Sequence, residues 1–120
     1  MSKPFDIQER LIAFAGDMVL FIRKLDQNMI GNYLINQILR SSGSAALNYA
    51  ESQSASSDKD YINKVAIALK ELRETEVNLK IMKHISIGGD MRQTLINENI
   101  ELIKILSTLI KNRKVKSNKT

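Results

Sequence analysis

Residues 38–60, ILRSSGSAALNYAESQSASSDKD, decide how the rest of the chain is interpreted. This stretch could be a linker, a phosphate-binding loop or a helix built from small side chains. A phosphate loop would need a preceding strand and a lysine, and this stretch has neither. Its apolar and small residues instead recur at helical spacing, which predicts a helix over residues 32–54. Gly43 costs a helix about 1 kcal/mol relative to alanine, so we expect that close packing explains it.

The same spacing predicts further helices over residues 7–25, from Ser57 to Gly88, and from Asp90 to about residue 112. No alternating strand pattern occurs. The chain is therefore predicted to be all-α, an antiparallel up-down-up-down four-helix bundle. We expect one domain at residues 1–112 and a basic, flexible tail at 113–120. The predicted core stripe of the second helix is Ile35, Leu39, Ser42, Ala46 and Tyr49.

Three helix starts carry capping signals. Asp6 followed by Glu9 resembles a capping box, and so does Asp90 followed by Gln93. Ser57 is a good N-cap residue, and acidic residues directly after it complement the helix dipole.

Composition narrows the class of protein. The sequence has no cysteine, so disulfides and thiolate metal sites are not expected. No apolar run approaches the roughly 20 residues that span a bilayer, and the first residues lack the apolar core of a secretory signal. We expect a cytoplasmic protein that does not bind a membrane.

Enzymatic chemistry finds no support in the residues, and we predict no catalytic residue, metal site or cofactor. The single histidine, His84, lies near a predicted helix end, where it complements the dipole. Glu71 and Glu74 lack the histidine that a bundle metal site would require, so a charged helix surface is the simpler interpretation.

The net charge of +5 is carried by the end of the chain. All acidic residues lie before position 111 and balance the basic residues there. Five cations remain, and they are the candidate nucleic-acid-binding residues: Lys111, Arg113, Lys114, Lys116 and Lys119. Five phosphate contacts on duplex DNA would give a salt slope of about −4.5. A tail of this kind can also serve only solubility. No aromatic residue is interleaved with these cations, so base stacking is not expected there.

A second aliphatic row on the fourth helix consists of Ile96, Ile103 and Ile110. The first helix has a weaker row at Ile12 and Val19. Such rows indicate either a wide core face or contact with another chain. Because a small bundle buries an outer row with difficulty, we favour a homo-oligomer.

Arg40 is expected to pair with Glu71 or Glu74, because a tight hairpin near residues 55–57 brings these positions level. The alternative places Arg40 in an outer row with Ser44, Leu47 and Glu51. That row would be a solvent face or would meet a neighbouring protomer.

Four segments between Leu39 and Leu79 resemble the signature of a bacterial family of four-helix-bundle proteins. This family was first noticed as reading frames inside intervening sequences of large-subunit ribosomal RNA genes. The matching segments are Leu39–Ser41, Asn48 to Glu51, Ser57 to Tyr61 and Lys70 to Thr75. The sequence departs from the family pattern at Ser52 and Tyr61.

The resemblance implies a small bundle, pentameric rings and no transferable catalytic residue. A more distant likeness, to accessory proteins of diversity-generating retroelements, implies basic barrels that engage nucleic acid. Two functions stay open: an oligomeric module that binds RNA, DNA or a ribonucleoprotein through the tail, and a structural or protein-interaction module with a protein partner.

Overall fold

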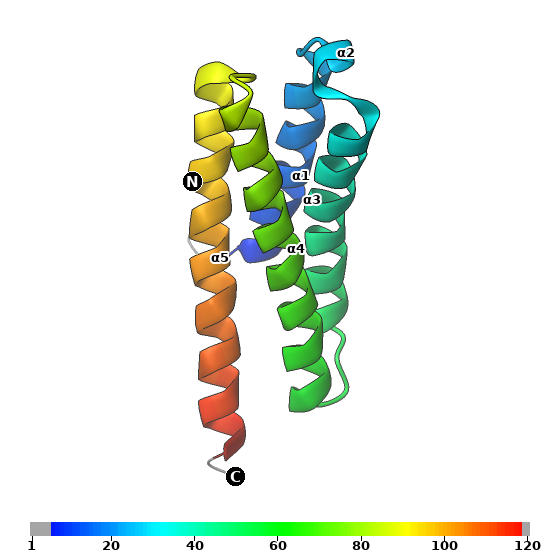
Figure 1. Cartoon of the computed structure of the whole chain (residues 1–120). Helices are drawn as coiled ribbons and strands as arrows, with labels where there is room; N and C mark the ends of the chain where they lie inside the picture. The colour runs from blue at the N-terminus through cyan, green and yellow to red at the C-terminus, as the bar shows by residue number, and fades with distance from the viewer. Residues whose placement is uncertain (1–5, 119–120) are drawn as a thin grey trace.

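The computed structural model describes residues 6–118, and all of its regular elements are helices (Figure 1). They are α1 (Ile7–Arg23), α2 (Gln27–Ile30), α3 (Asn32–Ser52), α4 (Asp58–His84) and α5 (Gly89–Asn118). Four long helices form the predicted up-down-up-down bundle, in which α4 lies between α3 and α5, and α1 packs on both of them. The predicted break at residues 26–32 contains the short α2.

Two of the three predicted caps are present. The side chain of Asp6 accepts a hydrogen bond from the Glu9 amide at 3.4 Å, and that of Ser57 accepts one from the Asp60 amide at 3.0 Å. The third prediction is wrong. Since α5 already begins at Gly89, Asp90 lies inside its first turn, and the side chain of Gln93 donates to Asn97.

The turn between α4 and α5 packs tightly against α1. Gly88 has a φ of 104°, and a Cβ added there would lie 2.7 Å from Cζ of Phe21. Both the left-handed backbone and the close approach require glycine. Near the start of α1, Arg10 donates to the Glu98 carboxylate of α5 at 2.7 Å.

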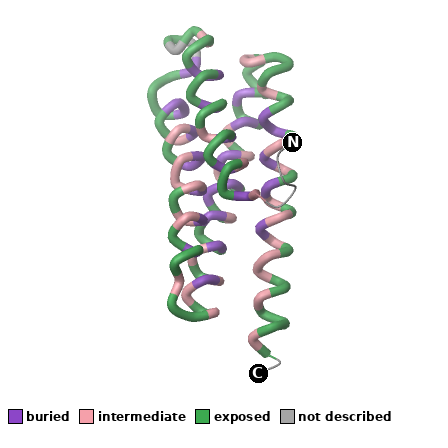
Figure 2. Tube along the Cα trace, turned by 180° about the vertical axis from the view of Figure 1, so that it is seen from behind, coloured by how far each residue is buried: buried purple, intermediate pink, exposed green. Residues whose placement is uncertain are grey.

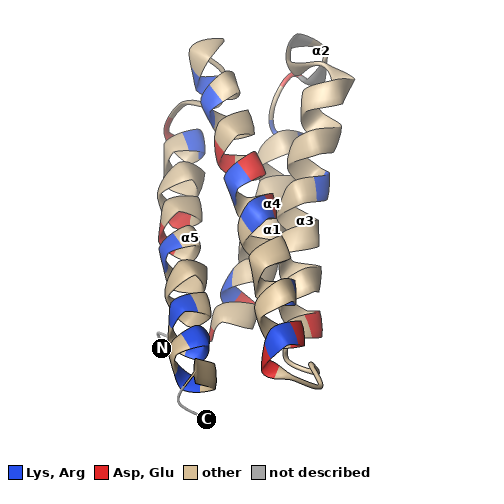
Figure 3. Cartoon of the chain, turned by 60° about the horizontal axis from the view of Figure 1, so that its bottom comes forward, with Lys and Arg blue, Asp and Glu red and all other residues tan. Residues whose placement is uncertain are grey.

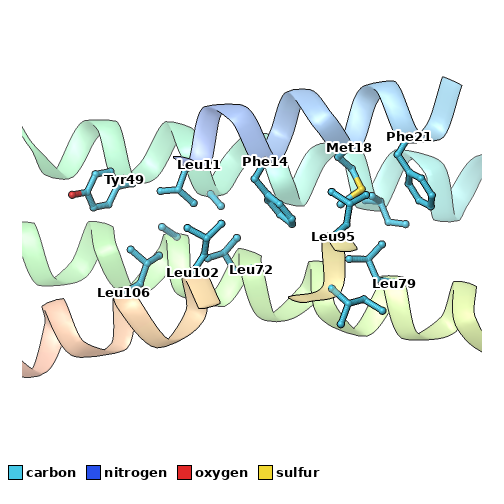
Figure 4. Packing of buried hydrophobic residues seen from close by; sticks show 14 of the residues in the cluster. Leu11, Phe14, Met18, Phe21, Tyr49, Leu72, Leu79, Leu95, Leu102 and Leu106 are labelled. Carbon is cyan, nitrogen blue, oxygen red and sulfur yellow. The ribbon is translucent and has the colours of Figure 1, made fainter. Parts of the chain in front are cut away.

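The core lies along the whole inner face of the bundle (Figure 4). The buried face of α3 differs from the predicted stripe, because Leu39 and Ala46 are only half-buried. The face instead centres on Ile38, Ser41 and Ala45, which are fully buried. The small side chains of α3 do allow a close approach, since Ser41 Oγ and Thr75 Oγ1 of α4 lie 2.6 Å apart.

Gly43 does not take part in this contact. A Cβ at Gly43 would meet no atom within 4 Å, so close packing inside the chain does not explain this glycine.

The helices differ greatly in length. With 17 residues α1 extends about 25 Å, whereas α5 with 30 residues extends about 45 Å. As a result α1 covers only the upper half of the bundle, and the lower half consists of α3, α4 and α5 (Figure 1).

The helix α5 runs through residue 112 without a break and continues to Asn118. Residues 113–118 therefore do not form the flexible tail that the sequence suggested. The sequence has no proline or glycine beyond Gly89 to end the helix, and Arg113 is anchored to α4. Lys119 lies outside the described residues.

Candidate nucleic-acid interface

The lower half of α5 presents a cationic surface. From Glu101 to the end of the sequence there is no further acidic residue. Lys104, Lys111, Lys114 and Lys116 are all exposed. Figure 3 shows blue positions gathered on the last turns of α5, and Figure 2 shows exposed and intermediate positions along the same turns.

Helical spacing divides these cations into two groups. Lys104, Lys111 and Lys114 are separated by seven and three residues, which places them along one outer row. Lys116 lies instead on the side of Arg113, three residues after it. Lys104 was not among the residues predicted from the sequence, because it lies before the dense basic segment. It joins a row with Lys111 and Lys114 because α5 continues as a helix past residue 112.

Arg113 is tied to the bundle and differs from its neighbours. Its Nη1 donates to Asp58 Oδ1 at 3.1 Å, and its guanidinium carbon lies 3.7 Å from the centre of the Tyr61 ring. Arginine stacks well on aromatic rings because its guanidinium group is planar and weakly hydrated. The cation is therefore partly neutralised and held in a fixed orientation.

A cavity of about 230 Å³ lies beside this stack, at the lower end of the bundle. Its lining residues are Ser52, Gln53, Ala55, Tyr61 and Arg113. Ser52 Oγ donates to the Tyr49 carbonyl at 2.5 Å and accepts from Gln53 Nε2 at 3.0 Å. Burial raises the pKa of the nearby Tyr49 hydroxyl, with smaller effects from Tyr61 and Asp6. The cavity wall is thus rich in hydrogen-bonding groups.

The sequence prediction missed this arrangement because Tyr61 is remote from the basic segment along the chain. The sequence nevertheless contained the information needed to predict the contact between Tyr61 and Arg113. A hairpin that turns at residue 87 brings residue 61 level with residue 113, by the same reasoning that placed Arg40 opposite α4.

Arg40 pairs with both of the glutamates that the sequence analysis named as possible partners. Its Nη1 lies 3.0 Å from Glu71 Oε2, and its Nη2 lies 2.7 Å from Glu74 Oε2. Burial raises the pKa of the Glu71 carboxyl, but hydrogen bonds and the charge of Arg40 outweigh burial and lower it below 4.5. The hydrogen-bonding neighbours are Glu74, Ser44 and Arg40. Arg40 thus cross-links α3 and α4 on the surface.

The outer row of α3 mixes exposed and half-buried side chains, both polar and apolar. Ser44 is half-buried and accepts a hydrogen bond from Asn48, while Glu51 pairs with Lys64 of α4 at 2.8 Å. Leu47 is 66% exposed. The row contains one large apolar side chain between polar groups that already have partners.

The predicted outer row of α5 belongs mainly to the core of the single chain. Ile96 is buried, and Ile103 and Ile110 pack against the core. A wide core face, the alternative interpretation, is therefore the correct one for these three residues. The row cannot serve as the argument for an oligomer.

An exposed apolar row occurs instead on the outer face of α4. It contains Ile67, Val77 and Ile81, of which Val77 is 57% exposed. Lys70 and Glu74 lie within this row at helical spacing, and Glu74 pairs with Arg40, which also pairs with Glu71. Beside Val77 is a shallow, largely apolar depression of about 360 Å³. On α1 the weaker row of Ile12 and Val19 is exposed, so it does not widen the core face.

Residues 6–118 contain no group of three or more histidine or acidic side chains arranged to hold a metal ion. Within that range no helix is both long and apolar enough to cross a membrane. His84 is exposed near the end of α4.

Comparison with known proteins agrees with the fold. A family model described as 23S rRNA-intervening sequence protein matches residues 4–108. A crystal structure from Bacteroides thetaiotaomicron, described as a protein with unknown function from the S23 ribosomal protein family, is 31% identical. The match covers 88% of this chain and 98% of that chain, with a TM-score of 0.78. A search of curated proteins finds no match.

Proposed function

The chain belongs to the 23S rRNA-intervening sequence protein family, and we propose that it acts there as a non-enzymatic, cytoplasmic module that binds the backbone of RNA or DNA. The observation that carries this proposal is the lower half of α5. That segment presents Lys104, Lys111, Lys114 and Lys116 to solvent, with no acidic residue after Glu101. Phosphates attract such a surface regardless of base sequence.

The number of lysines that can contact phosphates determines the affinity for nucleic acid and its salt dependence. Arg113 is already paired with Asp58, so four described lysines on α5 remain for phosphate contacts. Four contacts would give a salt slope of about −3.6 on a duplex. One chain with so few contacts binds weakly at physiological salt, and several chains side by side would multiply the number of contacts.

Self-association is therefore part of the proposal. Its support is the row of exposed apolar side chains on α4, Ile67, Val77 and Ile81. Lys70 and Glu74 lie within the same row and carry opposite charges, so packing a second copy there would bury no net formal charge. The family resemblance indicates five subunits. Sedimentation of the wild type against a Val77→Glu/Ile81→Glu variant tests the idea, with Met91→Glu as an exposed control on α5. A monomer at micromolar wild-type concentration would contradict it.

Fluorescence anisotropy with a labelled RNA, measured from 50 to 300 mM salt, tests nucleic-acid binding. The test variant replaces Lys111, Lys114 and Lys116 with glutamine. The matched control replaces Arg23, Lys24 and Lys83, three exposed cations at the upper end of the bundle, and so loses the same charge. We expect the test variant to lower the duplex salt slope by about 2.7 and the control to change it little. Equal losses in both variants, or no binding by the wild type at 50 mM salt, would refute the proposal.

A second candidate function is a protein-interaction module without a nucleic-acid role. The apolar depression beside Val77 favours it, since exposed apolar surface of this kind marks protein contacts. A protein partner that is retained after nuclease treatment and lost in Val77→Glu/Ile81→Glu would favour this candidate over nucleic-acid binding.

A further inference from the structure

The cavity beside Arg113 is not explained by binding to a nucleic-acid backbone. Phosphates are held by exposed cations, whereas this cavity is lined by a serine, a glutamine, a tyrosine and an arginine whose charge is already paired. It lies at the lower end of the bundle, on the side of α5 that carries Lys116. Its polar walls suit a ligand with hydrogen-bonding groups at its edge.

The stack of Arg113 on Tyr61 provides a planar surface. Asp58 and the Tyr61 ring fix the orientation of the guanidinium group, at 3.1 and 3.7 Å respectively. Single-stranded nucleic acids place their unpaired bases on aromatic rings and on guanidinium planes of this kind. Because both members of the stack line the cavity, a flat ligand inside it would contact the guanidinium group with Tyr61 supporting it.

The remaining wall offers hydrogen bonds at the edge of such a ligand. Gln53 is exposed, and besides the N–H that donates to Ser52 its amide carries a second N–H and a carbonyl oxygen. The volume of about 230 Å³ is several times the roughly 30 Å³ that one water occupies in the liquid. That space suits one flat heterocycle.

Lys116 lies in the right place for an adjacent phosphate. It is exposed and three residues after Arg113, so it occupies the same side of α5 one turn further on. The charge of Asp58 is balanced by Arg113, which removes the nearest repulsion for a phosphate.

We propose that the cavity formed by Ser52, Gln53, Tyr61 and Arg113 holds one unpaired nucleobase of a single-stranded nucleic acid, stacked on Arg113, while Lys116 contacts a neighbouring phosphate. This inference rests on the proposed function and narrows it from nucleic acid in general to single strands. In a duplex the bases are paired and stacked, so they cannot enter the cavity.

The test compares three labelled ligands of equal charge in anisotropy measurements: an unstructured single-stranded RNA, a duplex, and a strand of the same length whose bases are replaced by abasic sites. The wild type should bind the single strand about fivefold or more tightly than the abasic strand. Equal affinity for these two strands overturns the base cavity and leaves the proposed backbone binding standing. No binding to any of the three overturns both.

The variant Arg113→Lys keeps the charge and removes the planar group. We expect it to lose about fivefold or more in affinity for the single strand and nothing for the abasic strand or the duplex. Arg23→Lys at the exposed end of α1 is the matched control and should bind all three ligands as the wild type does. A circular dichroism melt confirms that both variants are folded. An equal loss on all three ligands by Arg113→Lys would show that Arg113 acts only through charge or folding, and it would overturn the inference.

Discussion

The upper and lower halves of this bundle are held together by different kinds of contact. Around α1, four helices enclose a core in which Phe14, Met18 and Leu79 are almost or completely inaccessible to solvent. Below the start of α1 only three helices continue, and there the contacts include a stacked cation, an ion pair and a polar cavity. Apolar packing should therefore dominate stability in the upper half, and the lower half should tolerate change and carry binding.

The largest expected effect is in the upper core. Phe14→Ala should lower the free energy of unfolding by about 3–5 kcal/mol, because it removes a large, buried side chain and leaves a cavity. Urea denaturation measures the loss. Ile12→Ala, two residues away and 56% exposed, is the control and should change stability by less than about 0.5 kcal/mol. Similar losses for both variants would mean that burial in the described chain does not determine stability here.

Gly88→Ala tests the upper turn. Its new Cβ would meet Phe21 at 2.7 Å in a backbone with a φ of 104°. We expect a loss of about 2–4 kcal/mol from steric overlap and left-handed strain together. Gly43→Ala provides the contrast, since its Cβ would meet no atom in the chain, and it should stabilise the helix by up to about 1 kcal/mol. A destabilised Gly43→Ala variant, with a dependence on protein concentration, would instead place Gly43 against a second copy.

Glu71→Gln tests the cross-link between α3 and α4. Hydrogen bonds and Arg40 lower the pKa of Glu71 below 4.5 despite burial, so its ionised form stabilises the folded state. This contribution is present above the unfolded pKa and is lost as the pH falls through the folded pKa. We expect the wild type to exceed the variant by about 1 kcal/mol or less at pH 7. The gap should close as the pH falls through the lowered pKa of Glu71, in denaturation curves measured at several pH values. A gap independent of pH would contradict this account.

The smallest effect belongs to the lower half. Asp58→Asn removes the partner of Arg113, and because both side chains are partly exposed the loss should be about 1 kcal/mol or less. Thermal melts in low and in 1 M salt test the electrostatic origin, since screening over about 3 Å at 1 M should remove most of the difference. A loss of stability comparable with that of Phe14→Ala would contradict the proposed difference between the two halves.

The sequence was sufficient for features that depend on local spacing. The helical spacing of the apolar residues and the capping residues predicted the four long helices. The geometry of the hairpin between α3 and α4 predicted the pairing of Arg40 with α4. It was insufficient where burial depends on a neighbour in space. The row of Ile96, Ile103 and Ile110 has the same spacing whether it faces solvent or packs against a core, and only the positions of the other helices decide between them.

The same limit applied to the site. The exposed lysines at 111, 114 and 116 follow directly from composition. The stack of Arg113 on Tyr61 does not, because it joins the start of α4 to the end of α5. An interpretation confined to the basic segment therefore excluded base stacking at a position where the fold supplies an aromatic ring.

The short α1 also has a consequence for how the chain opens. α3, α4 and α5 form two consecutive hairpins with extensive contacts, whereas α1 packs less extensively, on α3 and, across the length of the chain, on α5. Local contacts form quickly and with little loss of chain entropy, while a contact between distant segments forms late. α1 is therefore the segment expected to dock last and to detach first. Its amides should exchange with solvent at a lower free energy than those in the middle of α4, in a partly open state that keeps the lower half intact.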